Sequence, residues 1–536
     1  MTRVETMLRE LDTPDTQSDV TWTTGNVAEA FPGVFTTLGM TFGFAPMELA
    51  FRKMFYDLGV YPASEVKIPN DVEDCFWAVF SGWAAGNIDK FADIANVMPG
   101  TSASAVEQQL FGYVRPGTVN ANTIRRYPQI IGKAPRWIAS TPRKHDAMFA
   151  DLRRWRIAQL PKIGGLDEPG CLALLEDARR RFGDMMSIHM GVAMISSSIA
   201  EKVTAAAVAV GLADLEASLL SGVGSDENEV AAHLWDLAHG AITLDEFTNK
   251  HGYHGPNEGQ LSGVTWRENP APVLARLDDY RTISADSPRA PRLRSAAQTE
   301  TRRRAVAQLL SATPRHKRAA VAGTVKLAAR FLALREQGKA GYLITFDVAR
   351  AAARQLGGHL VARGVIDDGE DVFHLAYDAL AAGMTGDQRS VVADRAAQYR
   401  DRQLLRLPKS WSGRPEISKA GEGAGEVLAS GGVITGVAAS GGVVEGRARV
   451  VRDPGETELD DGDILVCETT DPSWVSLFMV AGGVVTDFGG LLSHGPIVAR
   501  ELGIPCVCGT ETGSYRITDG MQLRVDGDRG TVELIG

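Results

Sequence analysis

The spacing of hydrophobic and polar positions changes near residue 420. Upstream, apolar residues recur at steps of three and four, which is the period of an amphipathic helix. The clearest series is Leu175, Ala178, Phe182, Met185, His189 and Val192. The segments 203–212 and 327–356 continue this pattern with many alanines. The sequence therefore predicts a large, mainly α-helical domain over residues 1–417.

Downstream, the pattern is that of short strands. Brief apolar runs alternate with Gly and Asp turns at 442–451, 463–468, 483–486, 504–508 and 522–526. Before them, residues 418–432 are rich in Gly, Ala and Glu, which is typical of a flexible linker. We therefore expect a compact domain with a β-sheet over residues 433–536, so that the whole protein is multidomain.

The segment 486–505 predicts a strand, a glycine turn and a short helix. Pro496 suits the first turn of a helix, Gly503 suits the left-handed residue that ends one, and Pro505 prevents continuation. His494 then stands just before the helix N-terminus, where free backbone N–H groups and the helix dipole favour an anion. Because a neutral imidazole is nucleophilic near pH 7, His494 is a candidate phosphoryl carrier. The alternative is a capping Ser493 beside an incidental exposed histidine.

These residues resemble the phosphohistidine signature of the PEP-utilising enzymes, which include phosphoenolpyruvate synthase, pyruvate phosphate dikinase, rifampin phosphotransferase and phenylphosphate synthase. The resemblance runs from Gly441 to the closing Val525-Asp-Gly-Asp. It implies a small swivelling β/β/α domain with phosphate carried on His494. It also implies a phosphohistidine loop formed by Thr486, Gly489, Gly490, Ser493 and Arg500. The chain departs at Gly495-Pro496, where many members have two alanines.

The upstream part resembles the acceptor-binding domain of rifampin phosphotransferase more than that of other members. The resemblance rests on segments that begin at Trp22, His251, Thr265, Arg335 and Gly364. It implies an acceptor pocket formed by Trp22, His254, Glu258 and Arg267. At His254 and Gln260 the family usually has Arg and Asp, so rifampin itself is in doubt as the acceptor.

The motif Arg335-Glu-Gln-Gly-Lys339 has a physical logic of its own. Arg335 and Lys339 are four residues apart and share one helix face, with Glu336 beside them. Two cations there could hold an arriving phosphohistidine, while the carboxylate takes the proton of an acceptor hydroxyl. With His494, these three residues are the candidate catalytic set. The alternative is a solvated charged face of a helix.

Other polar residues favour structural roles. His251, His254 and Glu258 could be zinc ligands, but Gly and Pro lie between them and no fourth ligand is evident, so we predict no metal site. His189 and His374 lie among apolar residues and are expected to be core histidines. Cys506 and Cys508 are expected to share one face of a strand as packed thiols.

Composition limits the class of protein. The 536 residues are 44% hydrophobic and 23% charged, as expected for a soluble protein of two or three domains. A net charge of −10 argues against a nucleic-acid or anionic-membrane partner. Residues 1–20 lack a signal-peptide core, and no uninterrupted apolar run is long enough to span a bilayer. Five cysteines without a paired framework favour a reducing cytoplasm.

The sequence contains no Gly-rich phosphate loop followed by Lys. Nor does it resemble the ATP-grasp domain or the phosphoenolpyruvate-binding barrel of the family. We therefore expect a split, dikinase-type phosphotransferase, as in phenylphosphate synthase, in which a separate ATP-grasp subunit binds ATP and Mg.

In the family the histidine takes the β-phosphoryl group of ATP and leaves AMP and phosphate. By this resemblance, His494 would pass that group to a hydroxyl of a small organic molecule. The alternative is a phosphohistidine carrier or regulatory protein that docks a protein partner and performs no small-molecule chemistry.

Overall fold

The computed structural model describes residues 2–535 apart from 14–15, 18, 26, 28–30, 100, 112–113, 221, 224–225, 283, 288–289, 420, 423–424, 453–458, 471–473, 479 and 491–493. It also leaves out the side chains of 108–111, 217, 226–227, 279, 475–476, 494 and 501. The fold divides into two compact units. Unit 1 comprises residues 1–191, 259–263 and 338–420, and unit 2 comprises 192–258, 264–337 and 421–536.

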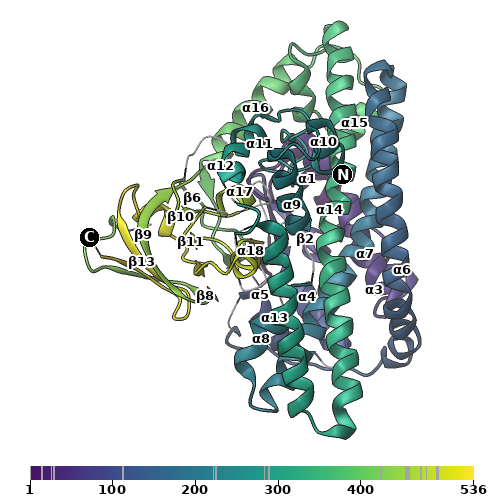
Figure 1. Ribbon diagram of the computed structural model, residues 1–536. Coiled ribbons are helices and arrows are strands. Elements are labelled where there is room, and N and C mark those ends of the chain that lie inside the picture. Colours follow the sequence, from purple (N-terminus) through teal and green to yellow (C-terminus); the bar gives the residue numbers. More distant parts are fainter. Residues whose placement is uncertain are drawn as a thin grey trace. The chain divides into compact units, whose positions relative to one another are not determined.

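Unit 1 is mainly helical, as the period of its apolar residues predicts (Figure 1). Its α-helices are α1 (Arg3–Glu10), α3 (Thr37–Asp57), α4 (Ile88–Val97), α5 (Ala103–Phe111), α6 (Tyr127–Gln159), the first part of α7 (Glu168–Val208), the second part of α14 (Arg318–Ala362), α15 (Tyr377–Ala381) and α16 (Arg389–Gln403). Short 3-10 turns connect them: η1 (Ala63–Glu65), η2 (Val72–Asp74), η3 (Leu160–Gly165) and η6 (Gly369–His374).

The apolar series on α7 lies in the interior. Phe182 and Met185 are at most 1% exposed, and His189 is 9% exposed. By length and composition alone α7 could cross a bilayer, and among the described residues it is the one helix that passes that test. Because its apolar stripe is already packed inside the protein, we describe α7 as a core helix.

Unit 1 also contains an antiparallel sheet that the helical pattern did not predict. Its strands, in spatial order, are β2 (Trp77–Phe80), β3 (Trp83–Asn87), β1 (Thr21–Thr23) and β5 (Ser410–Ser412). Trp22 of β1 faces Trp411 of β5 in register. Each strand has three to five residues, too few for a clear alternation of apolar and polar positions. A second, two-stranded pair joins β4 (Leu405–Arg406) and β6 (Ser418–Lys419).

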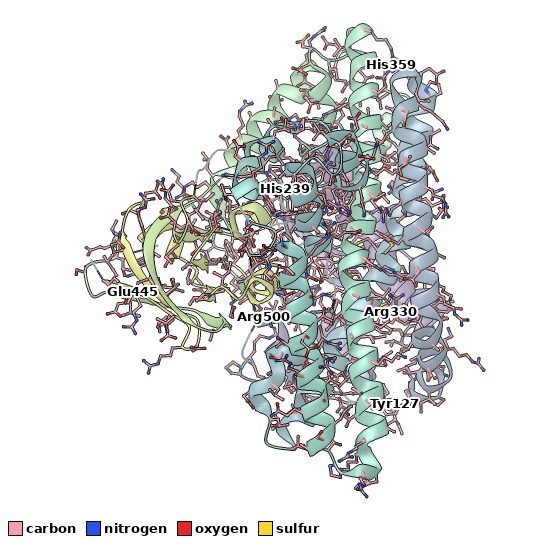
Figure 2. The ribbon with its side chains drawn as sticks, viewed as in Figure 1. Tyr127, His239, Arg330, His359, Glu445 and Arg500 are labelled. Carbon is pink, nitrogen blue, oxygen red and sulfur yellow. The ribbon has the colours of Figure 1, made fainter. Side chains whose placement is uncertain are left out.

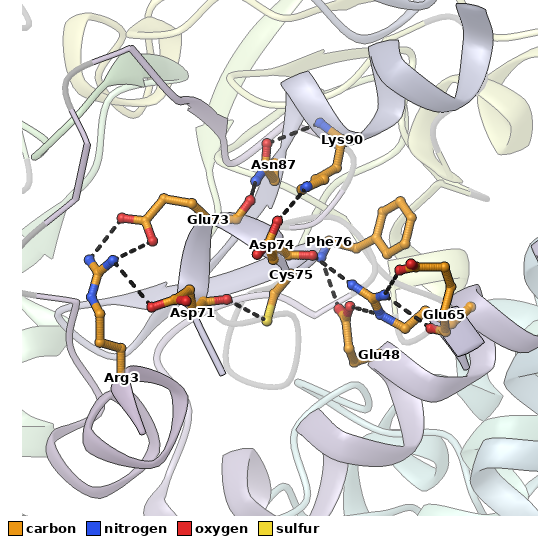
Figure 3. Close-up of polar contacts among 11 residues, drawn as sticks. Arg3, Glu48, Glu65, Asp71, Glu73, Asp74, Cys75, Phe76, Asn87 and Lys90 are labelled. Atoms are coloured by element: carbon orange, nitrogen blue, oxygen red, sulfur yellow. Dashed lines mark hydrogen bonds and ion pairs between the residues drawn. The ribbon is translucent and has the colours of Figure 1, made fainter. Parts of the chain in front are cut away.

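A buried polar network joins α3 to the segment before β2 (Figure 3). The Glu48 carboxylate accepts hydrogen bonds from Arg52 Nε at 2.7 Å and from the backbone N–H of Phe76 at 2.9 Å. Arg52 also donates to the carbonyl of Asp74 at 2.6 Å. Burial raises the pKa of Glu48 to about 6, although Arg52 and the other donors act in the opposite direction.

The helical part of unit 2 surrounds a second core that includes Phe247, Trp266 and Tyr280. Its elements are the second part of α7, η4 (Ala213–Leu215), α8 (Glu216–Leu220), α9 (Asp226–Ala238), α10 (Leu244–His251), α11 (Ala271–Ala275), α12 (Leu277–Thr282), α13 (Pro291–Ala312), η5 (Arg315–Lys317) and the first part of α14.

The C-terminal part of unit 2 contains an eight-stranded mixed sheet, drawn in yellow and yellow-green in Figure 1. In spatial order its strands are β7 (Val433–Thr435), β14 (Thr531–Leu534), β13 (Gln522–Asp526), β9 (Val443–Val450), β10 (Ile464–Cys467), β11 (Gly483–Thr486), β12 (Cys506–Cys508) and β8 (Val437–Ser440). Strands β9 to β12 are parallel, and the outer strands are antiparallel.

Side chains from alternate positions of these strands enter two separate cores. Cys506 and Cys508 pack on one face, with Phe478 of α17 (Val475–Phe478) and Val498 of α18 (His494–Leu502). Val507, between them, packs on the other face. All five cysteines of the chain are free and buried. The predicted fold class, a large helical region followed by a small β-rich domain, is confirmed.

The segment 418–432, which the sequence predicts as a linker, contains ordered contacts. Ser418 and Lys419 form strand β6, and Leu428 is 4% exposed in the core of the C-terminal domain. The two units are each made of several segments of the chain, and their limits differ from the predicted ones. The domain boundaries 1–417, 418–432 and 433–536 therefore remain a proposal.

Candidate functional site

His494 is the first residue of α18, and the loop that precedes it begins at the carboxyl end of the parallel strand β11. Gly503 has a φ of +66° and follows the last residue of the helix, as predicted. The carboxyl end of parallel strands is where α/β proteins usually bind ligands. Ser493 and the side chain of His494 lie outside the described residues.

Thr486 and the two glycines form the described beginning of this loop. Thr486 is 1% exposed, and its hydroxyl donates to the carbonyl of Phe488 at 2.9 Å. Gly489 has a φ of +126°, in the region that favours glycine. A Cβ on Gly490 would meet no described atom within 4 Å.

The departure at Gly495 has a packing explanation. A Cβ on this residue would lie 2.6 Å from the hydroxyl oxygen of Thr470, closer than real Cβ contacts. Thr470 therefore takes the space that an alanine side chain would need.

Arg500 lies in the last turn of α18 and is labelled in Figure 2. It is half-buried, and its Nε donates to the carbonyl of Pro496 at 3.2 Å. A cation in the last turn stabilises the negative end of the helix dipole. We therefore assign Arg500 at least a helix-stabilising role.

Sequence reasoning missed Asp487, which directly follows β11. Its carboxylate is 1% exposed and accepts hydrogen bonds from the Thr510 hydroxyl at 2.7 Å and from the backbone N–H of Ser514 at 3.1 Å. Burial raises the pKa of Asp487, although hydrogen bonds from Ser514 and Thr510 act in the opposite direction. The sequence could have suggested only that an acidic residue stands at a strand end.

A second missed group stands at the end of the neighbouring strand β10. The hydroxyl of Tyr515 donates to the carboxylate of Glu468. The Arg452 guanidinium lies 5.1 Å from the centre of the Tyr515 ring and 3.9 Å from a Glu468 oxygen. The backbone carbonyl of Glu468 also accepts the N–H of Phe488, so this group adjoins the phosphohistidine loop.

The proposed acceptor motif lies on α14. Arg335 Nε and Glu336 Oε1 are 2.9 Å apart, and the two side chains are 15% and 16% exposed. Lys339, one turn on, is also half-buried. Their partial burial distinguishes these residues from a fully solvated charged face.

Gly338, inside this motif, marks a close approach of three helices in unit 1. A Cβ on Gly338 would lie 2.4 Å from Nδ1 of His189 on α7 and 3.3 Å from Nε2 of His145 on α6. His189 also meets the ring of Tyr342 edge-on at 5.6 Å. His189 is therefore a core histidine, as predicted, while His145 was not singled out by the sequence.

Three of the four predicted pocket residues, His254, Glu258 and Arg267, belong to the central loop in unit 2. His254 Nδ1 and Glu258 Oε2 are 2.8 Å apart, and both side chains are at most 3% exposed. The backbone N–H of Arg267 donates to the carbonyl of Gly252 in the same loop at 3.0 Å.

Trp22, the fourth predicted pocket residue, belongs to the other unit. It is fully buried and packs edge-on against Phe80 at 5.3 Å. Its position in the sheet of unit 1 thus gives it a core-packing role there.

The structure also bears on the remaining candidate groups. His251 Nε2 lies 3.0 Å from His233 Nδ1. Among the described side chains, no group of three or more His, Cys, Asp or Glu is arranged to hold a metal ion. His374 is half-buried, and burial lowers its pKa.

Comparison with known proteins identifies two regions. Residues 459–530 match the model of the PEP-utilising enzyme, mobile domain, and residues 240–336 match the rifampicin phosphotransferase fourth domain. His494 and Asp487 lie in the first region, and the His254 loop, Arg335 and Glu336 lie in the second.

Curated relatives match about half of the chain or less. The rifampicin phosphotransferase of Streptomyces sviceus is 31% identical over 308 residues, which is 54% of this chain and 34% of that protein. The Bacillus subtilis protein of the same name is 32% identical over 206 residues, 38% of this chain and 24% of the relative. An uncharacterized Mycobacterium tuberculosis protein is 29% identical over 286 residues, 53% of this chain and 30% of its own length.

The aligned part of the chain thus spans about a third or less of the length of these relatives. The resemblance seen in the phosphohistidine signature is nevertheless confirmed by independent matches in two separate regions. Two regions of the chain are therefore similar to known domains, one to the mobile domain of the PEP-utilising enzymes and the other to the fourth domain of rifampicin phosphotransferase.

Proposed function

We propose that this chain is a phosphotransferase subunit that moves a phosphoryl group through His494 to a hydroxyl of a small organic molecule. The observation that carries the proposal is the phosphohistidine signature in the segment between β11 and α18, within the region that matches the mobile domain. The names of the relatives support phosphoryl transfer as the reaction type.

Three displacements at phosphorus make up the proposed reaction. First, an imidazole nitrogen of His494 attacks the β-phosphorus of ATP, a P–N bond forms, and the P–O bond to the α-phosphate breaks, so that AMP leaves and His494 carries a pyrophosphoryl group. Water then attacks the γ-phosphorus, the bond between the β- and γ-phosphates breaks, and inorganic phosphate leaves, so that His494 keeps the β-phosphoryl group. Next, the acceptor hydroxyl attacks the phosphohistidine, the P–N bond breaks, and the hydroxyl proton passes to a base. We assign that base to Glu336, with Arg335 and Lys339 stabilising the charge on the transferred group.

The acceptor end would consist of the α14 motif and the central loop. The matched fourth domain includes Arg335, Glu336 and the His254–Glu258 pair. Because a histidine and a glutamine stand where the family usually has Arg and Asp, we propose an acceptor other than rifampicin. His254, Glu258 and Arg267 are the residues that we expect to select it.

ATP and Mg would be held outside these 536 residues, on an ATP-grasp subunit. This part of the proposal is supported by the lack of a Gly-rich phosphate loop with a following Lys in the sequence. A cytoplasmic location fits a chain whose five cysteines are all free and buried. A gene for an isolated ATP-grasp protein beside that of this chain would support the split arrangement.

The decisive experiment supplies the chain and the candidate ATP-grasp protein with ATP labelled at the β-phosphate. We expect an acid-labile, base-stable label on this chain, mapped to His494 by mass spectrometry. Label on another residue would overturn the assignment of His494. If the label then moved to a protein and never to a small hydroxylated compound, the alternative of a phosphohistidine carrier would replace the enzyme proposal.

A further inference from the structure

The carboxyl end of β11 is fixed by a buried carboxylate seven positions before His494. Asp487 is 1% exposed, and each of its two carboxylate oxygens receives hydrogen bonds from the segment that follows β12. The donors are the Thr510 hydroxyl, the Ser514 hydroxyl and the Ser514 backbone N–H. A carboxylate that accepts hydrogen bonds at both oxygens is well satisfied, because ionised Asp can only accept.

The backbone reinforces the same connection. The N–H of Thr510 donates to the carbonyl of Thr486, and the N–H of Glu511 donates to the carbonyl of Asp487, both at 3.1 Å. On the other side, the N–H groups of Asp487 and Phe488 donate to carbonyls of residues 467 and 468 at 3.1 and 2.8 Å. The start of the loop is therefore held between the ends of two neighbouring strands.

We propose that Asp487 is a positioning residue, whose carboxylate fixes the phosphohistidine loop to residues 510–514 and thereby sets where His494 stands. This inference rests on the proposed function, since it assigns a role in phosphoryl transfer. A misplacement of about 1 Å at a reacting group can cost ~10² in rate, so a loosened loop base would slow transfer without removing any group that touches phosphate.

The contact with Thr510 offers the sharpest test. Thr510→Val keeps the shape of the side chain and removes the donor, whereas Thr510→Ser keeps the donor. Asp487→Asn keeps the shape of the anchor and places an N–H2 group among donors. Asp528→Asn, at an exposed aspartate in the same domain, is the matched control.

Loading of His494 can be measured on the full chain with potassium phosphoramidate as a small phosphoryl donor. This donor needs no nucleotide subunit. We expect Asp487→Asn and Thr510→Val to slow loading at least tenfold, Thr510→Ser to load within twofold of wild type, and Asp528→Asn to load normally.

Amide hydrogen exchange by mass spectrometry separates positioning from general loss of structure. We expect faster exchange in residues 487–490 of the two slow variants, with the strands β9, β10 and β13 as protected as in wild type. Equal loading of wild type and Asp487→Asn would overturn the inference, as would slow loading accompanied by exchange throughout the sheet. If wild type itself did not load at His494, the proposed function would fail as well, and the two failures are thus distinguishable.

Discussion

At the scale of single residues, the proposed chemistry depends on one imidazole and on a few side chains far from it in the sequence. His494 begins α18, while the proposed acceptor residues Arg335, Glu336 and Lys339 lie on α14. If phosphate is loaded and unloaded at different places, substitutions at the two ends should affect different half-reactions. The first three predictions use this separation and the close packing around the acceptor motif.

The His494→Ala variant should remain folded and accept no phosphoryl group. The reason is that this substitution removes the proposed nucleophile and changes none of the residues that form the two described cores of the domain. Thermal unfolding and phosphate analysis of the same sample check the two halves of the prediction. Acid-labile phosphate persisting in the variant would contradict the assignment.

Lys339→Ala should load His494 normally and transfer onward ~10²–10³ times more slowly, because a cation at a phosphoryl-transfer site stabilises developing charge. Lys326→Ala, an exposed lysine on the same helix, is the control. Single-turnover chase of labelled phosphohistidine into acceptor separates the two steps. Discharge at the wild-type rate would show that the motif is only a helix surface.

Gly338→Ala should destabilise unit 1, since the new Cβ would stand 2.4 Å from the ring of His189. Overpacking of this kind typically costs about 1–3 kcal/mol. Gly358→Ala, on the same helix with open space around it, should be neutral or slightly stabilising. Denaturant unfolding of both variants measures the difference, and equal stability of the two would refute the proposed close packing.

At the scale of elements, helix α3 is connected to the sheet of unit 1 by the buried Glu48–Arg52 pair. Arg52 donates to Glu48 and to the backbone carbonyls of Glu65 and Asp74, so one guanidinium joins three segments (Figure 3). Such a pair is costly to break, because the remaining partner stays buried without its counter-charge. It is also sensitive to pH.

Because burial raises the pKa of Glu48 to about 6, the folded state holds a proton there that the unfolded state has released. The contribution of Glu48 to stability is therefore present below its ordinary pKa and is lost as the pH rises through about 6. Over this window the free energy of unfolding should fall by up to about 2 kcal/mol.

Denaturant titrations between pH 4.5 and 7.5 check this prediction against Glu48→Gln, in which the decrease should be missing. Identical pH dependence in the two proteins would mean that Arg52 keeps Glu48 ionised throughout.

At the scale of the whole molecule, the chain combines a region similar to the mobile domain of the PEP-utilising enzymes with a region similar to the rifampicin phosphotransferase fourth domain. We expect the purified chain to neither bind Mg–ATP tightly nor consume it, because the proposed ATP site lies on another subunit. Isothermal titration calorimetry with Mg–ATP is the measurement. Micromolar binding would place a nucleotide site within the 536 residues and replace the split arrangement.

The amino-acid sequence alone determined the change from helical to strand period near residue 420 and the strand at 483–486. It also determined the helix that Gly503 ends. These features are local, because burial of one face and the backbone preferences of Gly and Pro are recorded in consecutive residues. The phosphohistidine signature is local for the same reason, since loop and helix are continuous in the chain.

Only the tertiary structure decided which distant groups meet. The Asp487 carboxylate accepts hydrogen bonds from Thr510 and Ser514, which lie 23 and 27 residues further along the chain. Gly338 lies close to histidines of two other helices. The strands of unit 1 were likewise too short to be predicted from the alternation of apolar and polar residues. Side-chain hydrogen bonds and close approaches depend on how separate elements pack, and a hydrophobic period specifies which face is buried without specifying what lies against it.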